Sequence, residues 1–71
     1  MNLQAAAALA KGRLADLFGS PRDLSLESFL YDDHLMVWSL TFGYAETAGK
    51  RVAKLVRVSE ANQAVLSVAD A

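Results

Sequence analysis

The chain has 71 residues, with seven basic against eight acidic side chains, a formal net charge of −1 and no cysteine. Without cysteine it can form no disulfide, thiolate nucleophile or thiolate metal site, and its single histidine argues against an all-protein zinc site. The balanced charge lacks the basic excess that neutralises a phosphate backbone, so we expect no nucleic-acid partner.

A chain of this length is near the lower size limit for one hydrophobic core, which supplies only ~3–5 kcal/mol of net stability. Small domains often add disulfides, a metal or self-association. Because neither a disulfide nor a zinc site is available, we expect self-association.

The sequence also bears on location. No segment approaches the ~18 consecutive apolar residues of a spanning helix. The alanine-rich start has no Lys or Arg before it, unlike a signal peptide. We therefore expect no membrane partner and a cytoplasmic location.

Residues 3 to 18 carry the period of an amphipathic helix. Apolar side chains recur every three or four residues and form one stripe, made of Leu3, Ala7, Ala10, Leu14 and Leu17. Asn2 is a suitable N-cap, and Gly19 suits the left-handed position at which helices end. Pro21 then disfavours continuation of the helix.

Two β-rich segments, 24 to 31 and 34 to 44, flank Asp32-Asp33 and predict a hairpin with a two-residue turn. That turn pairs Tyr31 with His34, Phe29 with Met36, Glu27 with Trp38 and Leu26 with Ser39. The second segment is the expected central strand, and its alternation gives a helix-facing side of Met36, Trp38, Leu40 and Phe42, joined by Phe29. Such side chains more often form a core than a ligand pocket.

The small, polar connection Ala45 to Gly49 leads into a strand over 50 to 58, and Ser59 to Gln63 form a turn before a last strand over 64 to 69. Pairing Val58 with Ala64 gives a helix-facing side of Val56, Val58, Leu66 and Val68. We expect residues 1–71 to be a single α+β domain, with an N-terminal helix packed on a four-stranded antiparallel meander.

Three segments together resemble the small PepSY-like domains, which have a half-cystatin layout: a helix ending in LFG, the stretch DDHLMVWSLTFGY and the hairpin KLVRVSEANQAVLSV. The likeness spans nearly the whole chain, and its motifs are structural. It departs at the last turn, where such domains usually carry an acidic residue with Thr-Gly and this chain has Ser59, Asn62 and Gln63. The resemblance implies a stand-alone bacterial module without catalytic residues, similar to those in protease propeptides or envelope proteins.

Asp32, Asp33 and His34 form the only cluster in which carboxylates meet an imidazole. Such a cluster is either part of a metal or ligand site in an accessory subunit, or a solvated hairpin tip. A divalent metal normally needs three or four ligands at defined spacing, which favours the tip. No serine lies in a GxSxG elbow and the glycines are scattered, so we expect neither an enzyme nor a cofactor.

The other face of the expected sheet is the feature that indicates a partner. Under these registers it collects seven aliphatic side chains: Leu24, Leu26, Leu30, Leu35, Val37, Leu55 and Val65. Such a patch exceeds the few hundred Å² that a soluble monomer usually exposes. We therefore predict a non-enzymatic interaction module that forms a homodimer or docks on a protein partner, as inhibitor and immunity-type proteins do.

Overall fold

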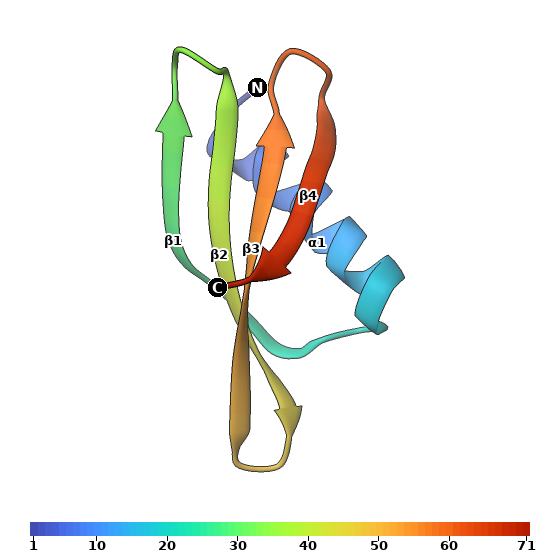
Figure 1. Cartoon of the computed structure of the whole chain (residues 1–71). Coiled ribbons are helices and arrows are strands. Elements are labelled where there is room, and N and C mark those ends of the chain that lie inside the picture. The colour runs from blue at the N-terminus through green and yellow to red at the C-terminus, as the bar shows by residue number, and fades with distance from the viewer.

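The computed structural model describes all 71 residues, Met1–Ala71. One helix, α1 (Leu3–Phe18), is followed by four strands: β1 (Arg22–Asp32), β2 (Val37–Thr47), β3 (Lys50–Ser59) and β4 (Ala64–Asp70). The strands form one antiparallel sheet in the order β1-β2-β3-β4, and α1 crosses one face of it behind β2, β3 and β4 (Figure 1). The predicted α+β fold, one helix and a four-stranded meander, is confirmed.

The helix begins and ends where its sequence predicts. The Asn2 side chain accepts a hydrogen bond from the Ala5 N–H at 2.8 Å, and Gly19 has a φ of +75° just after the last turn. Leu17, predicted to lie on the buried stripe, is 47% exposed. The reason is that the last turn of α1 runs past the edge strand β4 (Figure 1).

The core lies between α1 and the two central strands. Its largest fully buried side chains are Leu14 of α1, Leu40 and Phe42 of β2, and Val56 and Val58 of β3. Phe29 of β1 pairs with Leu40 and faces the same side, yet it is 56% exposed. Its predicted place in the core is wrong because α1 lies behind β2, β3 and β4 and does not cover this part of β1 (Figure 1).

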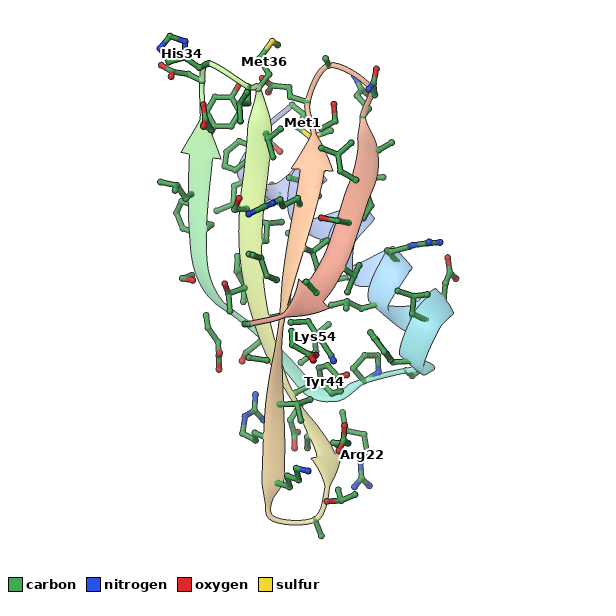
Figure 2. All side chains as sticks on the ribbon, in the orientation of Figure 1. Met1, Arg22, His34, Met36, Tyr44 and Lys54 are labelled. Atoms are coloured by element: carbon green, nitrogen blue, oxygen red, sulfur yellow. The ribbon has the colours of Figure 1, made fainter.

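The β1–β2 connection has four residues, 33 to 36, and not the two that the sequence predicted. Tyr31 pairs with Trp38 and not with His34, so the predicted register is wrong. Strand β2 begins at Val37, and Met36 lies exposed at the end of the connection instead of in the core (Figure 2).

Asp32 accounts for the longer connection. Its Oδ1 accepts the N–H groups of His34 at 2.9 Å and Leu35 at 3.0 Å, as Asp does in turns. Met36 takes a φ of +55° at the return into β2. A two-residue hairpin turn instead needs a positive φ at one or both of its central positions, which Asp-Asp adopts less readily than Asp-Gly.

A β-bulge at Glu27 changes which face the first half of β1 presents. The register shifts between Leu26 and Ser28, so that Leu26 pairs with Phe42 of the core. One extra residue moves the side chains beyond it to the other face of the sheet. Leu24 and Leu26 therefore pack against the core, and their predicted place on the outer face is wrong.

A second bulge, at Leu66, has the same effect in β4. The register shifts between Arg57 and Val58, so that Val58 pairs with Val65. Val65 therefore packs against the core, and its predicted place on the outer face is wrong. Leu66, predicted to face the helix, is instead 54% exposed.

Strands β2 and β3 continue beyond the rest of the sheet as a two-stranded arm (Figure 1). Thr47 pairs with Lys50 across a two-residue turn, in which Gly49 has a φ of +78°. The predicted connection over 45 to 49 is thus mostly strand.

Candidate interaction surface

The sheet face opposite α1 carries aliphatic side chains around a shallow concavity of about 440 Å³. Its lining residues are Leu30 and Asp32 of β1, Leu35 of the connection, Val37 and Ser39 of β2, Arg57 of β3 and Leu66 of β4. We call these seven residues the outer-face patch. The patch thus draws on all four strands, and no other element of the chain covers it (Figure 1).

The leucines of the outer-face patch are far more exposed than those of the core. Leu35 is 71% exposed and Leu30 is 69% exposed, and together with Leu66 they are three of the four most exposed large apolar side chains in the chain. Clustered apolar exposure of this kind typically marks a protein interaction site. Single exposed leucines would need no such explanation.

Four of the seven predicted interface residues lie on this face: Leu30, Leu35, Val37 and Leu55. Leu55 is one row away from the concavity, where it pairs with Thr41. Leu66 is an addition that the sequence did not reveal, because a strict period of two assigns it to the same side as Val68. Only the bulge turns it outward.

The outer-face patch also holds one cation and one anion without a charged partner in the chain. Arg57 takes part in none of the three ion pairs, which join the N-terminus to Glu60, Lys50 to Glu46 and Lys54 to Asp70. Asp32 uses Oδ1 for the turn, and no hydrogen bond engages Oδ2. Both charges are therefore open to groups from outside.

Asp32, Asp33 and His34 do not assemble into a larger polar site. Figure 2 shows His34 at the outer end of the connection, away from the body of the sheet. No group of three or more His, Asp or Glu side chains converges as a metal site requires. Asp32 has a structural role in the turn, and a ligand site at this tip stays a prediction.

A hydrogen-bonded cluster holds together the end of the sheet that carries the patch. Glu60 accepts a hydrogen bond from the Met1 ammonium at 2.8 Å and another from the Tyr31 hydroxyl. The Glu60 N–H donates to the Met36 carbonyl at 2.9 Å. The β3–β4 turn is thereby tied to the connection that carries Leu35.

The cluster shifts the pKa of both side chains. The hydrogen bond to Glu60, with desolvation second, raises the pKa of Tyr31 to about 12. Hydrogen bonds from the N-terminal ammonium and then from Tyr31 lower the pKa of Glu60. Sequence reasoning missed this cluster because Glu60 is 59 residues from Met1 and 29 from Tyr31, so no local pattern links them.

A second, smaller groove of about 170 Å³ runs between α1 and β4. Its lining residues are Arg13 and Leu17 of the helix and Val65, Leu66, Ser67 and Val68 of the strand. This groove shares Leu66 with the outer-face patch but opens on the helix side. Leu17 therefore distinguishes the two surfaces, because it lines the groove and not the patch.

The only helix lacks the combination of length and apolar character needed to cross a membrane. Comparisons of the chain with protein-family models, with curated proteins and with solved structures found no match. The likeness to PepSY-like domains therefore stays a prediction.

Proposed function

We propose that this protein is a non-enzymatic interaction module that forms a homodimer through its outer-face patch. The observation that carries the proposal is the cluster of Leu30, Leu35 and Leu66, each more than half exposed, on the sheet face that α1 does not cover. Burying such side chains between two copies removes apolar area from water at about 25 cal/mol per Å².

The size of the chain supports a second copy as the occupant. A standard interface buries roughly 800 Å² per partner, which is less than a fifth of the 4488 Å² accessible surface of this chain. Self-association also stabilises a small domain whose single core contributes little by itself.

The charges of the patch support the same occupant. Arg57 and Asp32 give it one positive and one negative group, neither of which has a charged partner in the chain. A symmetric dimer presents the same patch twice, so a patch that carries both signs is able to complement itself. A partner of another kind, such as the target of an inhibitor or immunity-type protein, is the other outcome that the experiment below distinguishes.

Gel filtration with light scattering, at tens of micromolar protein, tests the proposal. We expect the wild-type mass to be twice the 7.6 kDa of one chain. Leu30→Glu should raise the dimer Kd by more than ~30-fold, as loss of a central interface side chain does. Leu17→Glu is the matched control and should leave the dimer intact.

Two results would contradict the proposal. A wild-type mass of one chain at this concentration would exclude the homodimer and leave a different protein as the only occupant of the patch. A dimer that Leu17→Glu dissociates and Leu30→Glu does not would assign the interface to the helix-side groove. Circular dichroism of both variants checks that the fold is retained.

A further inference from the structure

The pairing of the strands fixes how the residues of the outer-face patch are arranged. Leu30, Ser39 and Arg57 are direct neighbours across β1, β2 and β3, and so form one row. Asp32 and Val37 are direct neighbours in the next row. Asp32 and Arg57 are thus two strands and one row apart, or roughly 12 Å on a regular sheet.

A diagonal from Leu30 to Val37 divides the patch into two sides. Asp32 lies on one side of this diagonal, together with Leu35 in the connection that follows it. Arg57 lies on the other side, together with Leu66 on the strand beyond it. Each side therefore contains one charged group and one exposed leucine, and the two charges are opposite.

We infer that the dimer has its two-fold axis along this diagonal, so that Asp32 of each copy pairs with Arg57 of the other copy. This inference rests on the proposed homodimer. When two sheets pack face to face, their two-fold axis lies in the interface and exchanges the two sides of the line along which it runs. Leu35 of each copy then packs against Leu66 of the other.

The chemistry of the two charged groups fits this arrangement. An apolar interface that covered Arg57 without supplying an anion would leave a buried, unpaired charge, which is strongly unfavourable. Asp32 keeps Oδ2 free while Oδ1 holds the turn, so it can accept a guanidinium N–H without losing the turn. Two-fold symmetry supplies the pair twice in each dimer.

Charge reversal tests the inference, with the dimer Kd as the measured quantity. Arg57→Glu places two carboxylates opposite each other at both symmetric positions, and Asp32→Lys places two cations there. We expect each variant alone to weaken the dimer by at least ~10-fold. An equimolar mixture should recover dimers, because a heterodimer of the two variants restores both opposite-charge pairs with one pair inverted.

Matched variants separate this pairing from other effects. Arg13→Glu and Asp33→Lys make the same changes in charge outside the outer-face patch, and we expect both to leave the Kd within ~3-fold of the wild-type value. Asp32→Asn keeps an oxygen acceptor for the turn. Mixed with Arg57→Glu, it should form heterodimers more tightly than Arg57→Glu dimerises alone, because one attractive pair remains and no repulsive one.

Native mass spectrometry of the mixtures distinguishes the outcomes. Heterodimers in excess of both homodimers support the pairing of Asp32 with Arg57. If Arg57→Glu dimerises as tightly as the wild type, or if mixing restores nothing, the pairing is wrong while the outer-face homodimer stands. A wild-type protein that stays monomeric overturns the homodimer itself.

Discussion

Alternate residues of the same strands form the two faces of the sheet, yet the side chains of the two faces are buried to very different degrees. On the helix side, Leu40, Phe42, Val56 and Val58 are completely buried under α1. On the other side, Leu30 and Leu35 have aliphatic side chains of similar size and remain about two-thirds exposed. Packing within one chain explains the burial of the first face and does not explain the apolar side chains of the second, and for this reason we propose that a partner covers the second face.

Removing a large side chain from each face should give the largest difference in stability between the two faces. Phe42→Ala should cost about 3–5 kcal/mol of unfolding free energy, because Phe42 is fully buried. That loss is as large as the whole stability expected of such a core. Leu30→Ala should change the stability of the monomer by less than ~0.5 kcal/mol. Urea denaturation below the dimer Kd measures both, and equal losses would place Leu30 in the core of a single chain.

Two neighbouring residues on β4, Val65 and Leu66, lie on different faces because of the bulge. Val65→Glu should destabilise the monomer by about 1–3 kcal/mol, because Val65 packs against the core. Leu66→Glu should keep the fold and weaken the dimer, because Leu66 points out of the core. Thermal melts and sedimentation separate the two effects. A regular strand without the bulge would reverse these outcomes.

Weakening the connection that carries Leu35 should cost less stability. Asp32→Ala removes the acceptor for two backbone N–H groups and should lower stability by about 1 kcal/mol. Asp33→Ala, one residue away, removes no hydrogen bond of the turn and serves as the control. Faster amide exchange at His34 and Leu35 only in Asp32→Ala is the expected signature. Equal effects of the two variants would show that the Asp32 side chain does not stabilise the turn.

The smallest expected effect is a dependence of stability on alkaline pH. The pKa of Tyr31 is raised from about 10 to about 12 in the folded chain, so its contribution is fully present below pH 10 and is lost as pH rises towards 12. The difference in melting temperature between the wild type and Tyr31→Phe should therefore shrink over this range. Lys54, whose pKa is also raised, titrates in both proteins and cancels in the comparison. A constant difference would contradict the hydrogen bond to Glu60.

Local signals in the sequence were enough to predict the helix, the four strands and their order. The Asn2 cap, the alanine-rich stripe and Gly19 define α1 without help from the rest of the chain. The strand registers could not be predicted from local signals. Glu27 and Leu66 are recognised as extra residues only because they have no partner on the neighbouring strand. Each bulge exchanges the two faces, so a strict period of two assigned Leu24, Leu26 and Val65 wrongly.

Only part of the candidate surface could be predicted from the sequence. Leu30, Leu35 and Val37 follow from alternation near the first hairpin and do lie on the outer face. The position of Leu66, and the placement of Asp32 and Arg57 on opposite sides of the diagonal, depend on contacts between strands. The cluster around Glu60 joins residues from both ends of the chain, which no local pattern can bring together.

Distances between spin labels test the outer-face dimer most directly, and the absence of cysteine allows one label in each chain. Ser28→Cys places the label on the outer face beside Leu30, and Leu17→Cys places it in the groove between α1 and β4, on the helix side of the sheet. Because packed sheets lie about 10 Å apart and each helix adds a further layer, we expect under ~20 Å between the labels at position 28 and a longer distance, roughly 30 Å, at position 17. The reverse order of distances, or no measurable distance at either position, would contradict a dimer formed through the outer face.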